Sequence, residues 1–152
     1  GLEKIKNLHI LADNVKDRLG IISFFVDDIH YNLFVKLLND RFGIQVRGGC
    51  SCAGTYGHYL LHISKIYSNK ITNIIDEGDL SLKPGWVRLS IHPVMTDEEI
   101  EYLLYAISEI TIKSKKWSKD YIYNPKTNEY SIKRHKKQDI EMQMVKKWFS
   151  NI

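Results

Sequence analysis

The segment that decides the fold is Ile21-Ile22-Ser23-Phe24-Phe25-Val26, which is followed by a stretch of helical periodicity ending at Gly43. A short run of β-branched and aromatic residues, bounded by a glycine and two aspartates, is typical of a buried strand. The apolar side chains that follow recur at helical spacing, at Ile29, Leu33, Leu37, Leu38 and Phe42. A glycine directly after such a pattern is a common helix end. The sequence therefore predicts a strand at 21–26 and a helix from about 29 to 42.

The next segments extend this alternation of strands and helices. Residues 44–46 predict a short strand, and the apolar spacing of residues 60–74 predicts one amphipathic helix. Residues 86–91 alternate with period two, which places Trp86, Arg88 and Ser90 on one face of a strand and turns the other face to the core. Thr96 and Glu99 form a capping box at the start of a helix whose apolar stripe reaches Ile110. We expect an α+β fold, with a small antiparallel or mixed sheet covered by helices on one face.

The chain changes in composition near residue 111. Residues 1–110 carry 11 basic and 14 acidic side chains, whereas residues 111–152 carry 11 basic and 4 acidic ones. We therefore divide the chain into a domain at 1–112 and a basic C-terminal extension at 113–152. Within the extension, residues 120–132 predict a hairpin with a polar turn, and residues 140–149 predict an amphipathic helix. Lysines outnumber arginines there ten to one, which favours a solvated surface over nucleic-acid recognition.

Length and cysteine usage narrow the class of protein. A chain of 152 residues has the length of one domain, and its longest apolar run is far too short to span a membrane. The N-terminus lacks the pattern of a signal peptide, and Gly1 in place of Met suggests a processed or cut chain. The two cysteines stand one residue apart and cannot easily form a disulfide, so a reducing cytoplasm fits.

The stretch Arg47-Gly48-Gly49-Cys50-Ser51-Cys52-Ala53-Gly54 carries the densest chemistry in the chain. Its glycines permit tight turns and close approach, and an arginine beside a thiol favours the reactive thiolate. One interpretation is a mobile loop that presents a nucleophilic cysteine. The alternative is a tight turn whose cysteines are small buried side chains. The residues alone leave both interpretations open.

Two motifs carry a resemblance to a known family. The pattern formed by Arg47, Gly49, Cys52 and Ala53 resembles the active-site loop of cysteine desulfurases, which belong to the class V aminotransferases. The segment 83–100 resembles the strand of that family that bears the arginine for the substrate carboxylate, followed by the last common helix. The resemblance covers about residues 4–112. It implies the C-terminal small domain of a pyridoxal-phosphate enzyme, either a cysteine desulfurase or a selenocysteine lyase.

The same resemblance assigns roles to single residues. Cys52 matches the nucleophile that takes sulfur from the amino-acid substrate, and Arg88 matches the residue that binds the substrate carboxylate, with Arg47 as a second contact. His58 is a candidate contact to the cofactor phosphate. The family's cofactor lysine lies in a large domain that we expect to be absent from this chain, so the chain alone should be inactive. Full-length relatives are homodimers, and a sulfur-acceptor protein is an expected partner.

Three alternatives remain beside this interpretation. In a class V transaminase or another amino-acid lyase, Cys52 would be structural. A zinc site could use Cys50, Cys52, His58 and His62, although Cys-Xaa-Cys is tighter than the usual ligand spacing, and we expect no metal. A basic interaction module is the third alternative, and salt-dependent binding to nucleic acid would support it.

Overall fold

The computed structural model describes residues 1–50, 54–133, 142–143 and 145–146, and for residues 54 and 55 the backbone only. Its centre is a four-stranded antiparallel sheet with the order β1-β2-β4-β3. The strands are β1 (Leu8–Ile10), β2 (Ile21–Val26), β4 (Trp86–Ser90) and β3 (Arg47–Gly49). Strand β2 and the alternating strand β4 are confirmed and lie side by side in the middle, with Ser23 opposite Arg88. The α+β fold expected from the sequence is confirmed.

One face of the sheet carries the hydrophobic core. Helices α1 (Tyr31–Phe42) and α4 (Asp97–Trp117) pack against each other on this face, and α1 also contacts β3 and β4. Phe24 is fully buried and meets Phe34 edge to face, with ring centroids 5.6 Å apart. The predicted capping box of α4 is present, because Thr96 and Glu99 each accept a backbone N–H of the other. The capping box thus fixes the start of α4, and the buried apolar stripes of α1 and α4 face the sheet.

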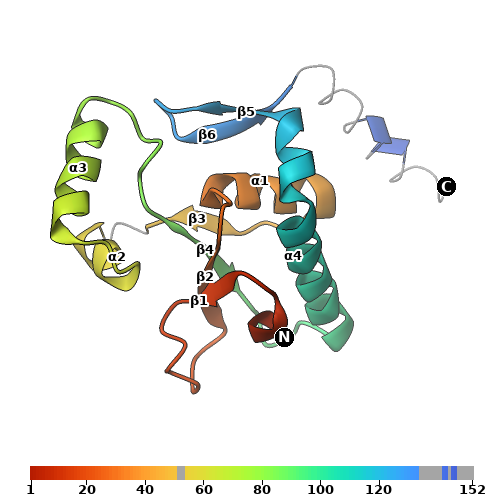
Figure 1. Ribbon diagram of the computed structural model, residues 1–152. Coiled ribbons are helices and arrows are strands. Elements are labelled where there is room, and N and C mark those ends of the chain that lie inside the picture. Colours follow the sequence, from red (N-terminus) through yellow and green to blue (C-terminus); the bar gives the residue numbers. More distant parts are fainter. Residues whose placement is uncertain (51–53, 134–141, 144, 147–152) are drawn as a thin grey trace.

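The other face of the sheet is covered in part by a pair of helices, α2 (Gly54–Leu60) and α3 (Lys65–Asp76). They lie across the sheet from α4, at the left in Figure 1. A Cβ at position 57 would lie 3.1 Å from the ring of Trp86, so the backbone of α2 closely approaches this side chain. Trp86 is only 6% exposed although it points away from the main core.

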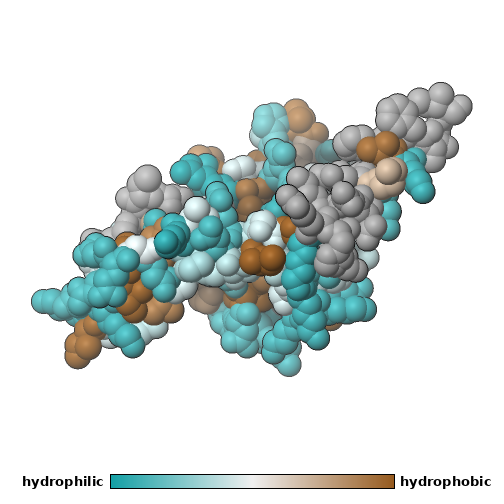
Figure 2. Space-filling model, turned by 90° about the horizontal axis from the view of Figure 1, so that it is seen from above, coloured by the Kyte–Doolittle hydropathy of each residue, from teal (hydrophilic) through white to brown (hydrophobic). Residues whose placement is uncertain are grey.

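The prediction of a single helix over residues 60–74 was wrong. The chain leaves helical geometry at His62, whose φ is 53°, and α3 begins only after Ser64, whose hydroxyl accepts the N–H of Tyr67. Ile66 is 86% exposed as a result, whereas Ile71 is buried. Seen from above, this end of the molecule is mainly hydrophilic with scattered hydrophobic atoms (Figure 2).

The predicted hairpin is present as β5 (Tyr121–Asn124) and β6 (Glu129–Ile132), which form a separate two-stranded sheet. A short 3-10 helix, η2 (Ser118–Asp120), joins it to α4. The hairpin lies above α1 in Figure 1, and Arg41 of α1 forms an ion pair with Asp120. The amphipathic helix expected at 140–149 falls on residues of which most lie outside the described part of the chain.

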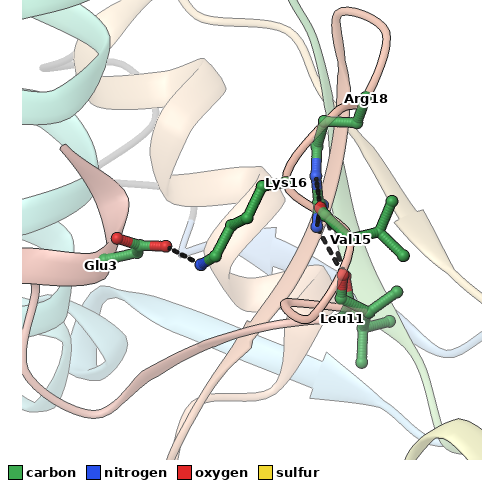
Figure 3. A network of polar contacts seen from close by, with 6 residues as sticks. Glu3, Leu11, Val15, Lys16 and Arg18 are labelled. Atoms are coloured by element: carbon green, nitrogen blue, oxygen red, sulfur yellow. Dashed lines mark hydrogen bonds and ion pairs between the residues drawn. The ribbon is translucent and has the colours of Figure 1, made fainter.

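The N-terminal region is held by its own polar contacts. A 3-10 helix, η1 (Leu2–Lys4), precedes β1, and Glu3 in it pairs with Lys16 at 2.7 Å. The Arg18 guanidinium donates to the carbonyl oxygens of Leu11 and Val15, and so closes the loop between β1 and β2 (Figure 3). These contacts are exposed and far from β3, so they organise the loop and add little to the site described below.

No helix in the described part of the chain has the length and apolar character needed to cross a membrane.

Candidate functional site

The root of the cysteine segment is a strand and not a loop. We expected the strand at 44–46, but the structure places it three residues later, as β3 at Arg47–Gly49. Gly48 lies opposite Val87 of β4 and faces α1, where a Cβ would lie 2.9 Å from Asn32 Oδ1. Only glycine allows the strand to approach the helix this closely. Gly48 therefore serves close packing, whereas Gly49 has open space beside it and adopts a φ of 118°, which favours glycine.

A row of polar side chains crosses the sheet on the face away from the core. Arg47 lies directly opposite Arg88, and Arg88 lies opposite Ser23 on its other side. Opposed residues of antiparallel strands point to the same face, about 5 Å apart at Cβ. The sequence placed Arg88 on this face correctly, and the pairing with Arg47 is the new information.

The two guanidinium groups lack a compensating charge in the described structure. Neither Arg47 nor Arg88 forms an ion pair with any residue that the structure describes. Like charges directly opposite each other destabilise a sheet. A carboxylate held between them would remove this repulsion, and the planar forks of two arginines suit its oxygen atoms. The row is therefore suited to bind an anionic group.

Cys50 follows β3 directly and is a partly buried free thiol. A Cβ at position 57 would lie 3.7 Å from the Cβ of Cys50, which places this cysteine against α2. Cys52 and Ala53 lie outside the described residues, so the nucleophile suggested by the resemblance stays a prediction. What the structure does provide is the fixed start of the segment that carries it.

Tyr31 and Asn128 form the support beneath this segment. The buried amide of Asn128 donates to the Tyr31 hydroxyl at 2.6 Å and accepts a hydrogen bond from the Tyr123 hydroxyl at 2.9 Å. The side chain of Asn32 donates to the carbonyl oxygen of Asn128. Burial raises the pKa of Tyr31, the hydrogen bond from Asn128 lowers it, and the nearby Cys50 adds to the rise. Tyr31 therefore remains a neutral phenol beside the thiol.

Tyr31 and Asn128 were not predicted from the sequence as site residues. They are 97 positions apart, and neither belongs to a motif. The one local signal was Asn128 itself, an asparagine in a hairpin turn, where it adopts a φ of 57°. Its burial at 7% exposure could not be read from the sequence.

The hairpin and β3 enclose a cleft of about 920 Å³. Its walls are α1, residues 45–50, the segment around Lys83 and residues 124–131 of the hairpin. Arg47 and Cys50 line this cleft, whereas Arg88 and His58 are not among its lining residues. The anion row and the cleft are thus two neighbouring features that share Arg47.

His58 forms a hydrogen bond to α3 and does not line the cleft. Its Nδ1 lies 2.6 Å from the hydroxyl of Ser68, which joins α2 to α3. The described residues hold no group of three histidine, cysteine or acidic side chains placed to bind a metal ion, and the alternative zinc site includes Cys52, which is not described.

The described residues do not form the main binding site of pyridoxal phosphate. Phosphate commonly binds the free N–H groups at a helix N-terminus. Here the N-termini of α1, α3 and α4 are occupied by the side chains of His30, Ser64 and Thr96. Lys36, one of two lysines in the cleft, pairs with Asp40. These residues can contact an amino-acid substrate, and the cofactor would need groups beyond them.

Comparison with known proteins gives one match. The model of the aminotransferase class-V family matches residues 1–103, which include β1 to β4 and the first part of α4. No curated protein matches the chain. The hairpin lies beyond the matched residues.

Proposed function

The chain belongs to the aminotransferase class-V family, and from this premise we propose that it is the C-terminal small domain of a pyridoxal-phosphate enzyme that removes sulfur or selenium from cysteine or selenocysteine. The observation that carries the proposal is the pair Arg47 and Arg88, which lie opposite each other at the root of the segment leading to Cys52. This pair supports a site for the substrate carboxylate close to Cys50, where the segment that leads to Cys52 begins.

In this proposal the arginine row binds and orients the amino acid. Arg88 lies in the middle of the sheet and donates to the α-carboxylate through its planar guanidinium. Arg47 donates from the edge strand and offsets the remaining charge. Ser23, on the other side of Arg88, offers a hydroxyl for a further hydrogen bond. The hydrophobic contacts of β2 and β4 below fix the row in place.

The sulfur step is assigned to Cys52. Its thiolate attacks the sulfur atom of the substrate, the carbon–sulfur bond breaks, and Cys52 keeps the sulfur as a persulfide while the amino acid leaves as alanine. Pyridoxal phosphate, when bound, supplies the electron sink for breaking that bond. Arg47, five positions before Cys52, favours the thiolate form if it lies close to the sulfur.

The full-length enzyme that carries this chain gives the test. Supplied with pyridoxal phosphate, cysteine and a thiol reductant that cleaves the persulfide, it should release alanine and sulfide, and Cys52→Ala should abolish both. Cys50→Ala is the matched control and should retain turnover. If Cys52→Ala turns over cysteine as fast as the unmodified enzyme, Cys52 is structural. Formation of a keto acid from other amino acids would then favour a class V transaminase.

We place the enzyme in the cytoplasm because of its cysteine usage, and we infer a homodimer from the family resemblance. The free thiol of Cys50 suits a reducing compartment. Several apolar side chains of α2 and α3 are exposed, including Tyr59 and Ile66, which would suit a covering domain or subunit. Size measurement of the full-length enzyme in solution tests the dimer, and a monomer at micromolar concentration would contradict it.

A further inference from the structure

The arginine row does not account for the size of the cleft between β3 and the hairpin. Its volume of about 920 Å³ lies near the upper end of the roughly 300–1,000 Å³ found for sites of drug-sized ligands. A single amino acid would leave most of it empty. Arg88, the main substrate contact in the proposed function, is not among its lining residues. The cleft therefore suits a larger ligand.

One wall of the cleft is an unpaired sheet edge. β3 is the last strand of the sheet, and it pairs only with β4. Within the described part of the chain, its backbone forms no hydrogen bond on the outer side. Six consecutive residues, 45–50, line the cleft, as expected when the edge itself faces it.

The opposite wall of the cleft is held by hydrogen bonds within the chain. Asn128 holds the hairpin to α1 by its bonds to Tyr31 and Asn32, and Leu80 donates its N–H to the carbonyl oxygen of Pro125. The rings of Tyr123 and Tyr130 pack around His30 at the start of α1. A binding cleft with fixed walls loses little entropy when a ligand enters.

The charge of the cleft favours an acidic ligand. Its lining includes three cationic side chains and one carboxylate, that of Glu129. Lys36 is neutralised by Asp40, while Arg47 and Lys83 form no ion pair with a described residue. Both are placed to attract carboxylates to the open edge.

We propose that this cleft binds an extended, acidic peptide segment of a partner protein, which adds a strand to the free edge of β3. Backbone hydrogen bonds to residues 47–49 supply the affinity, as in other cases of strand addition, and Arg47 and Lys83 select acidic side chains. The bound segment lies beside Cys50. That the partner is the acceptor of sulfur rests on the proposed function, whereas the binding itself does not.

The test uses the 152-residue chain labelled with nitrogen-15 and a capped six-residue peptide of alternating glutamate and valine. Addition of this peptide should shift the amide signals of residues 45–50 and slow their hydrogen exchange. Three controls are a lysine–valine peptide, an acidic peptide with proline at alternate positions, and free glutamate. All three should bind at least about tenfold more weakly, since they lack the charge, the backbone donors or the length.

Two variants with the same change in charge distinguish a contact in the cleft from a general effect of charge. Lys83→Glu should weaken binding of the acidic peptide by roughly tenfold or more, because it replaces an attraction by a repulsion. Lys116→Glu, on the exposed side of α4, should leave binding unchanged. Equal weakening by both variants would mean a general charge effect and would overturn the proposal.

Other outcomes also count against the proposal. Free glutamate binding as tightly as the peptide would indicate a small-carboxylate site, and signal shifts that depend on protein concentration alone would indicate a second copy of the chain. Absence of binding at millimolar peptide would overturn it outright. Arg88→Ala separates the two proposals: it should impair substrate turnover in the full-length enzyme and leave peptide binding to this chain intact.

Discussion

The two faces of the four-stranded sheet carry opposite chemistry on the same strands. On one face Phe24, Val87 and Leu89 are buried against α1 and α4, and no polar side chain of β2 or β4 interrupts them. On the other face Ser23, Arg88 and Arg47 form a polar row in which two cations lie opposite each other. The first face stabilises the fold, and the second keeps an unfavourable charge arrangement that suits an anionic ligand. Substitutions on the two faces should therefore separate stability from function.

The largest loss of stability is expected on the core face. Phe24→Ala removes a fully buried ring that meets Phe34 edge to face. We expect the free energy of unfolding to fall by about 3–5 kcal/mol, from lost burial and the cavity left behind. Chemical denaturation monitored by circular dichroism measures this. A fall of less than about 1 kcal/mol, close to the effect of a surface substitution, would mean that the core lies elsewhere.

A smaller loss is expected where the hairpin meets α1. Asn128→Ala removes the hydrogen bonds to Tyr31 and Tyr123 and leaves alanine at a φ of 57°. We expect a loss of about 1–3 kcal/mol, the range for leaving a buried polar partner unsatisfied. Asn128→Gly relieves the backbone strain but not the lost bonds. If Asn128→Gly is as stable as the unmodified chain, the contribution of Asn128 to stability comes from its backbone conformation and not from its hydrogen bonds.

His30 should give a smaller, pH-dependent effect. Burial lowers the pKa of His30, and its Nδ1 accepts the N–H of Asn32 at the start of α1. The unfolded chain therefore binds a proton more readily than the folded one, so stability is complete above the ordinary pKa of about 6.5 and falls as the pH decreases through it. His30→Asn keeps a cap acceptor that does not titrate.

The measurement is the free energy of unfolding of both proteins between about pH 5 and 8, the range in which histidine titrates. The unmodified chain should lose more stability toward acid than His30→Asn. Parallel curves for the two proteins would contradict the role of His30.

The smallest effect on stability is expected on the polar face. Arg88→Ala and Arg47→Ala each relieve the repulsion between opposed cations, so the free energy of unfolding should change by no more than about 0.5 kcal/mol. Thermal unfolding of both variants checks this. A marked loss would show that the arginines are structural, and the contrast between the two faces would then fail.

Local patterns in the sequence were enough to predict the elements whose signals come from residues close together in the chain. The strand at 21–26, the alternation around Arg88 and the capping box at Thr96 rest on neighbours within a few positions. β1 was missed because three residues carry too little periodicity, and it exists through pairing with β2. The shift of β3 has a similar cause: glycines predict a loop, but pairing with β4 and packing against α1 make them a strand.

The candidate site was predictable only in part. The sequence motifs single out Arg88 and Arg47 as candidates, yet their direct opposition depends on the register of β3 and β4, which no local pattern gives. The hydrogen bond from Asn128 to Tyr31, which holds the hairpin against α1, was not predicted because the two residues are 97 positions apart. Such contacts arise from the assembled fold, and single sequences carry no signal for them.

The most direct test of the central claim is the kinetics of the full-length enzyme with cysteine for Arg47→Ala, Arg88→Ala and the double variant. We predict that Arg88→Ala lowers kcat/KM roughly 30-fold or more, the equivalent of one lost charged hydrogen-bond pair of about 2 kcal/mol. Arg47→Ala should have a smaller effect, and the double variant should lose less than the product of the two, because both contact one carboxylate. Unchanged kcat/KM in Arg88→Ala would contradict the assignment of the polar row as the carboxylate site.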